Sequence, residues 1–152
     1  MIFFIVSAAV VLVLSVLCRR LALLYLADGT VKKLIPGFLE FVYVKNTGAA
    51  FGMMSGKTVF LSVVTGVIIA AIIFYVLAKR NDIPPLEKFS LSLITAGGLC
   101  NLYERIFFGF VTDYIDTHIL PVFNVADIAV TCGCILLIYT VFFPPKEKTD
   151  EQ

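Results

Sequence analysis

Long apolar stretches alternate with short polar breaks along the chain. Apolar residues dominate positions 2–26, 59–77, 86–107 and 123–143, and each stretch is close to the roughly 20 residues that a helix needs to cross a membrane. Pro84-Pro85 and Pro144-Pro145 follow the second and fourth stretches, and proline cannot continue a helix interior. The pattern predicts four transmembrane helices, followed by a polar tail at 144–152.

The break between the first and second stretches is longer and more varied than the others. Residues 27–58 contain glycines, lysines and a proline, but Phe38 to Val44 is rich in β-branched and aromatic residues, which is typical of a short strand. We expect an all-α membrane protein with a small β-like cradle outside the membrane at this point. Four helices and their connections account for positions 1–152, so a single integral membrane domain is expected.

Composition supports a membrane protein. Of the 152 residues, 60% are hydrophobic and only 15% are charged, against about 25% charged in soluble domains. The first stretch has no basic residue before Arg19, so it reads as an uncleaved span rather than a signal peptide. The net charge of +1 includes no run of lysines or arginines, and we expect no nucleic-acid partner. Basic residues in several connections leave the orientation undecided.

Cysteine and histidine do not indicate a metal site. The four cysteines lie in or beside apolar stretches, and Cys132 and Cys134 would point to different faces of a helix. They read as small packing residues. His118 has no Cys or His at ligand spacing. We therefore expect no metal and no cofactor.

Two acids, Asp113 and Asp127, end apolar segments, and ionisable groups at a membrane edge are costly enough to suggest function. If the two carboxyls lie close together, repulsion between them would leave one protonated near neutral pH. One could then activate water while the other donates a proton to a carbonyl oxygen. Asp116 is a rival for either role, although its position in a connection favours a solvated loop acid.

Helical spacing places two polar stripes on the third and fourth stretches: Gly97, Asn101 and Arg105 on one, and Asn124, Asp127 and Thr131 on the other. Facing each other, the stripes would hold the carboxyls together. The alternative is that these residues only link helices, with Arg105 neutralising Asp113 or Glu104. Carboxyls alone do not decide between the two.

Four segments resemble, in order, the signature segments of the lipoprotein signal peptidase (signal peptidase II) family: Asn46 to Gly52, Gly97 to Arg105, Gly109 to Asp113 and Phe123 to Asp127. The resemblance implies a bacterial inner-membrane aspartic endopeptidase. Such an enzyme removes the signal peptide from a diacylglyceryl-modified prolipoprotein, cleaving before the lipidated cysteine. It also implies that both termini are cytoplasmic and that the active site lies near the outer leaflet. We expect the protein to be a monomer in contact with membrane lipid.

The resemblance also implies a role for individual residues. Asp113 and Asp127 would be the catalytic dyad, and the substrate-binding residues would be Asn46, Gly97, Asn101, Arg105 and Asn124. Amide and guanidinium groups suit a peptide that enters from lipid with its hydrogen-bonding groups unsatisfied.

The chain departs from the family pattern in four ways. Glu104 stands where the family usually has Asp, Cys100 stands where it usually has Gly, and the segment from Ser15 to Arg19 lacks the usual acid. The interval between the two aspartates is also a few residues shorter. Two alternatives are therefore kept: an inactive homologue that binds lipidated peptides, and a small proton or cation transporter. Against the transporter, 59–77 and 134–143 continue no polar stripe across the membrane.

Overall fold

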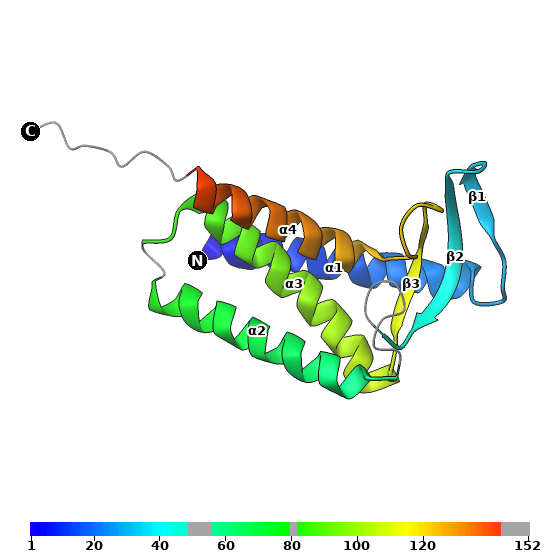
Figure 1. Cartoon of the computed structure of the whole chain (residues 1–152), viewed down its shortest axis with the longest axis horizontal. Helices are drawn as coiled ribbons and strands as arrows, with labels where there is room; N and C mark the ends of the chain where they lie inside the picture. The colour runs from blue at the N-terminus through cyan, green and yellow to red at the C-terminus, as the bar shows by residue number, and fades with distance from the viewer. Residues whose placement is uncertain (49–55, 80–81, 144–152) are drawn as a thin grey trace, which may run out of the picture.

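The computed structural model describes residues 1–48, 56–79 and 82–143. Its elements, in chain order, are α1 (Ile2–Tyr25), β1 (Lys32–Ile35), β2 (Leu39–Asn46), α2 (Thr58–Ala78), α3 (Pro85–Phe108), β3 (Val111–Asp116) and α4 (Val125–Phe142) (Figure 1). Each helix begins and ends within two residues of a predicted apolar stretch. The predicted tail and residues 49–52 of the first signature segment lie outside the described residues.

Three of the helices, α1, α2 and α4, are long and apolar enough to cross a membrane. The fourth, α3, has 24 residues but carries charged side chains, including Glu87, Glu104 and Arg105. It packs against each of the other three helices and lies between them in Figure 1. The most polar helix is therefore the one that its neighbours shield.

Glycines bring α3 and α4 close together. A Cβ added at Gly97 would lie 2.4 Å from the carbonyl oxygen of Ala126, and one added at Gly133 would lie 2.8 Å from that of Ser90. Small residues let membrane helices approach at this distance and gain packing contacts. The contact at Gly97 fixes the first turn of α4 against the middle of α3.

A three-stranded antiparallel sheet in the order β1-β2-β3 lies at one end of the helices. The expected cradle strand is β2, which confirms a small sheet next to the helices. The expectation of an all-α protein was too narrow, because β3 falls where only a connection was expected. In β3 the first four residues are all buried, so the strand lacks the alternation that marks a half-buried strand.

Pairing between β2 and β3 sets the position of one of the acids. The register places Val44 opposite Asp113 and Asn46 opposite Val111. Because alternate residues of a strand face the same side, Asn46 and Asp113 come together although they are 67 positions apart.

Candidate active site

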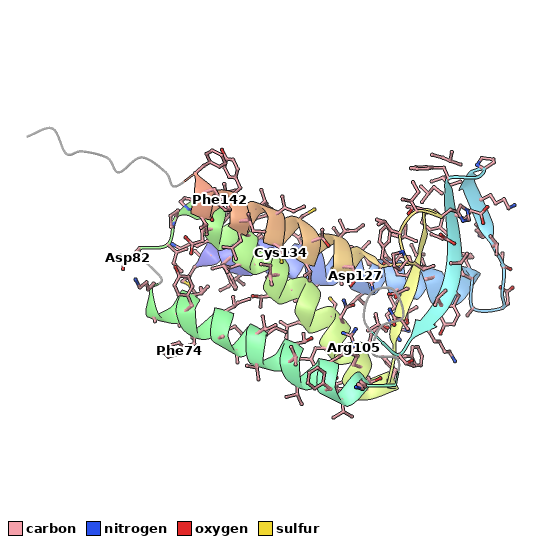
Figure 2. All side chains as sticks on the ribbon, viewed as in Figure 1. Phe74, Asp82, Arg105, Asp127, Cys134 and Phe142 are labelled. Atoms are coloured by element: carbon pink, nitrogen blue, oxygen red, sulfur yellow. The ribbon has the colours of Figure 1, made fainter. Side chains whose placement is uncertain are left out.

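Asp113 and Asp127 line one pocket, of about 530 Å³. Asp113 comes from β3, and Asp127 comes from the first turn of α4. The other polar residues that line the pocket are Asn46, Arg105 and Thr131, and most of the remaining pocket wall is apolar. Figure 2 shows Arg105 and Asp127 at the end of the helices that meets the sheet.

The Asp113 carboxylate is almost fully buried, with 1% of the residue exposed. It accepts hydrogen bonds from Asn46 Nδ2 at 2.7 Å and from Asn124 Nδ2 at 2.8 Å. Burial is the largest influence on its pKa, which rises to about 7; the bond from Asn46 opposes the rise and the charge of Asp127 adds to it. Asp113 can therefore hold or release a proton near neutral pH.

Asp127 is fixed at both carboxylate oxygens. Asn101 Nδ2 donates to Oδ1 at 2.7 Å, and the backbone N–H of Asn124 donates to Oδ2 at 3.1 Å. In return, Asn124 Oδ1 accepts from the backbone N–H of Asp127 at 3.0 Å. This reciprocal pair is a capping box, which satisfies otherwise unpaired N–H groups at the start of α4.

Asn124 connects the two acids. Its Nδ2 group donates both to Asp113 and, at 3.2 Å, to Asn101 Oδ1. The expected stripe treated Asn124 as a helical residue, but its backbone is extended, at φ −130° and ψ 177°. Lying just before the helix lets one side chain cap α4 and reach across to β3.

Arg105 faces the same pocket from α3. Its Nη2 donates to the carbonyl oxygen of Gly48 at 3.2 Å. Within the described residues it has no ion pair, and Glu104 instead pairs with Arg19 Nε at 2.9 Å. Arg105 therefore forms no direct ion pair with Asp113 or Glu104 among the described residues, although the charges of both acids lie near enough to interact with it.

Glu104 supports the site from outside the pocket. Besides Arg19 of α1, its Oε2 accepts from the backbone N–H of Thr112 at 2.9 Å. Thr112 precedes Asp113 in β3, so the carboxylate joins α1, α3 and the strand that carries the first acid. This role of Arg19 and Glu104 was not predicted from the sequence. Its only signal was two opposite charges in apolar stretches.

Four residues considered from the sequence do not line this pocket. Asn101 and Asn124 reach the two acids through their amide groups without lining it, and Gly97 and Asp116 do neither. Gly97 packs against α4 beneath the site. Asp116 lies at the end of β3, opposite Glu40, and its Oδ1 accepts from the backbone N–H of His118. Asp116 is therefore not brought to the dyad.

Metal-binding groups do not gather at this site or elsewhere in the described ranges, where no three His, Cys, Asp or Glu residues are placed to hold an ion. The four cysteines are unpaired. The chemistry available in the pocket is that of two carboxyls, their amide donors and one guanidinium.

Two carboxyls held by asparagine amides in one pocket, at the end of a bundle of apolar helices, define a membrane-embedded hydrolase of the aspartic type. The family model described as signal peptidase (SPase) II matches residues 6–143. The chain belongs to the signal peptidase II family.

Individual relatives agree over most of the chain. A lipoprotein signal peptidase of Clostridium acetobutylicum is 38% identical, covering 91% of this chain and 95% of the relative. One of Syntrophomonas wolfei is 44% identical, covering 77% of each. A solved structure of a bacterial membrane enzyme is 30% identical and superposes with a TM-score of 0.84, covering 98% of this chain and 93% of the other.

Proposed function

We propose that this protein removes signal peptides from diacylglyceryl-modified prolipoproteins, cleaving before the lipidated cysteine, with Asp113 and Asp127 as the catalytic dyad. The observation that carries the proposal is the chain of hydrogen bonds from Asp113 through Asn124 and Asn101 to Asp127. It holds both carboxyls in the walls of one pocket, as general acid–base chemistry on a peptide bond requires.

The pKa of Asp113, at about 7, favours this residue as the one that holds the shared proton. Asp127 then takes a proton from water, and the hydroxyl oxygen bonds to the scissile carbonyl carbon while Asp113 protonates the carbonyl oxygen. As the tetrahedral intermediate breaks its C–N bond, the leaving nitrogen takes the proton from Asp127. The hydroxyl proton returns to Asp113, which restores the starting state.

The remaining polar residues would bind the substrate backbone or hold the dyad. Arg105 lies in the pocket with donor groups beyond the one that Gly48 uses and can bind peptide carbonyl oxygens. The amide groups of Asn46, Asn101 and Asn124 donate hydrogen bonds to the carboxylates. Their main role is therefore to orient the dyad. Gly97 contributes by letting α4 lie close to α3.

We also propose that all four helices cross the membrane and that residues 1–152 form one membrane domain. Three apolar helices surround α3, which explains how a charged helix can span lipid. The N-terminus and Phe142 lie at the end away from the sheet. With both termini cytoplasmic, the sheet and the dyad lie near the outer leaflet of the bacterial cytoplasmic membrane. The chain is proposed to act as a monomer, in contact with membrane lipid.

Family membership disfavours the transporter. The inactive homologue is disfavoured because the amide partners of both acids are present and engaged. A cleavage assay separates this last alternative from the enzyme.

The test uses the purified full chain in detergent and a diacylglyceryl-modified prolipoprotein, with release of the signal peptide followed over time. Asp113→Asn and Asp127→Asn should each lower kcat by at least about 10²–10⁴-fold, because each removes a proton-transferring group. Asp116→Asn is the matched control and should keep wild-type activity. Binding of the substrate without cleavage by the wild type would refute the proposal and favour the inactive homologue.

A further inference from the structure

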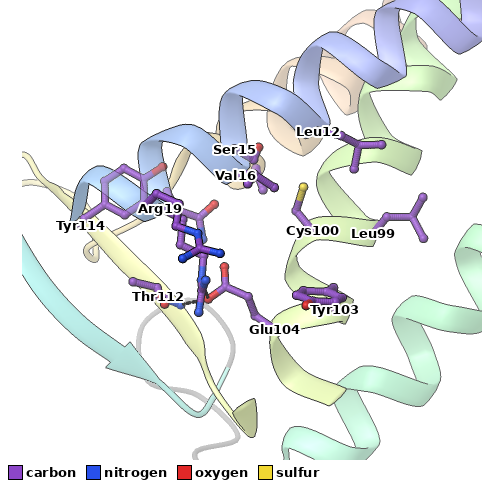
Figure 3. A pocket seen from close by; sticks show the side chains of 13 residues that line it. Leu12, Ser15, Val16, Arg19, Leu99, Cys100, Tyr103, Glu104, Thr112 and Tyr114 are labelled. Carbon is purple, nitrogen blue, oxygen red and sulfur yellow. Dashed lines mark hydrogen bonds and ion pairs between the residues drawn. The ribbon is translucent and has the colours of Figure 1, made fainter. Parts of the chain in front are cut away.

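A second pocket lies behind the dyad, on the other side of β3. Its volume is about 420 Å³, and it is bounded mainly by α1 and α3 (Figure 3). It shares no lining residue with the dyad pocket, but Asn124, whose amide donates to Asp113, forms part of its wall. Thr112 lines it whereas Asp113 lines the other pocket, because successive residues of a strand face opposite sides. The proposed peptidase mechanism does not use this space.

Most of the wall of this second pocket is apolar, and the pocket opens sideways between α1 and α3. Leu12 and Val16 of α1 face Leu99 and Tyr103 of α3 across it. Val16 and Tyr103 are 55% and 53% exposed. Both helices lie among the proposed spans, so this opening faces lipid, and an acyl chain matches the apolar wall better than water does.

The polar part of the pocket lies where α1 approaches the sheet. Arg19 is already paired with Glu104 and stacks over the Phe108 ring at 4.5 Å. Arg20 is exposed, lines the pocket, and has no ion pair among the described residues. The pair between Arg19 and Glu104 leaves one positive charge, which complements a phosphate.

Two buried hydroxyls that line the pocket, those of Ser15 and Thr112, make no hydrogen bond among the described residues. Thr112 is fully buried, and within the described ranges its Oγ1 makes no hydrogen bond. An unpaired buried hydroxyl is costly. The ester carbonyl of a glycerolipid can accept a hydrogen bond from such a hydroxyl.

We propose that this pocket binds an anionic phospholipid, with one acyl chain between α1 and α3 and the phosphate at Arg20. The arrangement of apolar wall, buried hydroxyl and exposed cation follows the order of groups in a phospholipid: chain, ester and phosphate. The site is separate from the substrate pocket and is occupied by a lipid of the surrounding membrane.

The test exploits the absence of tryptophan from the chain. Tyr103→Trp places a single fluorescent reporter in the pocket wall. Val13→Trp is the matched control, because Val13 is 57% exposed on the same helix as Val16 but does not line the pocket. Each variant of the full chain is reconstituted with phosphatidylglycerol or phosphatidylcholine that carries brominated acyl chains, which quench tryptophan.

At the Tyr103→Trp reporter, brominated phosphatidylglycerol should associate about fivefold more strongly than brominated phosphatidylcholine, as expected for one cation near a lipid phosphate. At Val13→Trp the two lipids should quench equally. Adding Arg20→Gln should abolish the preference and Arg20→Lys should retain it. Equal quenching at Tyr103→Trp, or a preference that survives Arg20→Gln, would overturn the proposal. Displacement of the quencher by a diacylglyceryl-modified prolipoprotein would assign the pocket to the substrate and overturn it too.

Discussion

Gly97 allows a direct test of how helix packing supports the dyad. In Gly97→Ala the new methyl group would lie 2.4 Å from the carbonyl oxygen of Ala126 and 2.8 Å from Val130 Cγ2. Ordinary contacts of this kind begin near 3.4 Å, so α4 has to move about 1 Å from α3. The obstacle is backbone, which cannot rotate aside as a flexible side chain can.

That displacement should affect both stability and catalysis. Overpacking of this size costs about 1–3 kcal/mol. The part of α4 that must move carries Asp127, whose bond from Asn101 is 2.7 Å long and cannot survive a 1 Å shift without rearrangement. A misplacement of this size costs on the order of 10²-fold in rate. We therefore expect a lower Tm together with a fall of about 10²-fold in kcat.

The measurements are the thermal unfolding midpoint in detergent and the rate of signal-peptide release from a diacylglyceryl-modified prolipoprotein. Gly66→Ala is the matched control, because its added Cβ would meet only Leu102 Cδ2, at 3.9 Å. It should leave activity unchanged and keep or slightly raise the Tm, since alanine favours helix over glycine. If Gly97→Ala behaves like Gly66→Ala in both measurements, the argument that close packing at Gly97 positions Asp127 is refuted.

Three further predictions concern the groups around the dyad. Because the pKa of Asp113 is raised from 3.8 to about 7, its contribution to stability is complete below about pH 4 and is lost as pH rises through about 7. Over the same alkaline range kcat should fall. Unfolding measured as a function of pH should show that Asp113→Asn removes this loss of stability. A double-mutant cycle with Arg19→Gln and Glu104→Gln, measured on the free energy of unfolding, should give a coupling free energy of about 1–3 kcal/mol, since Glu104 is buried. Losses of stability that simply add would contradict this coupling. Asn124→Ala should lower the free energy of unfolding by about 1 kcal/mol through loss of the helix cap and lower kcat about 10²-fold. Asn124→Asp should restore the cap but not the activity, because it adds a negative charge beside Asp113. If Asn124→Asp restores both, the amide group is dispensable.

The positions of the helices and of the two acids could be predicted because both depend on local signals. Apolar runs and proline pairs mark the helices, and a carboxyl at the end of an apolar segment is conspicuous. The strand β3 could not be found in this way, because it is buried on both faces and its partner is distant in sequence. The pairing of β3 with β2 places Asn46 beside Asp113. From the sequence, only the family resemblance indicated that Asn46 belongs to the same site as Asp113.

Two side chains illustrate the limits of helical spacing. Asn124 and Asp127 are three positions apart, which suggests one face of a helix, but the structure uses that spacing for a capping box. Gly97 shares a stripe with Asn101 and Arg105, yet its lack of a side chain serves the contact with Ala126. Spacing shows which residues share a face; it does not show which of them a neighbouring helix covers.

The pairing of β2 with β3 also has a consequence for the order in which the enzyme becomes active. Asn46 and Asp113 meet across 67 positions of sequence, so their contact closes a long loop that includes α2 and α3, and such contacts form late in folding. Asp127 lies further along the chain still. We therefore expect α1 and α2 to be inserted well before the dyad exists, so that a partly synthesised chain can occupy the membrane without cutting the precursors around it.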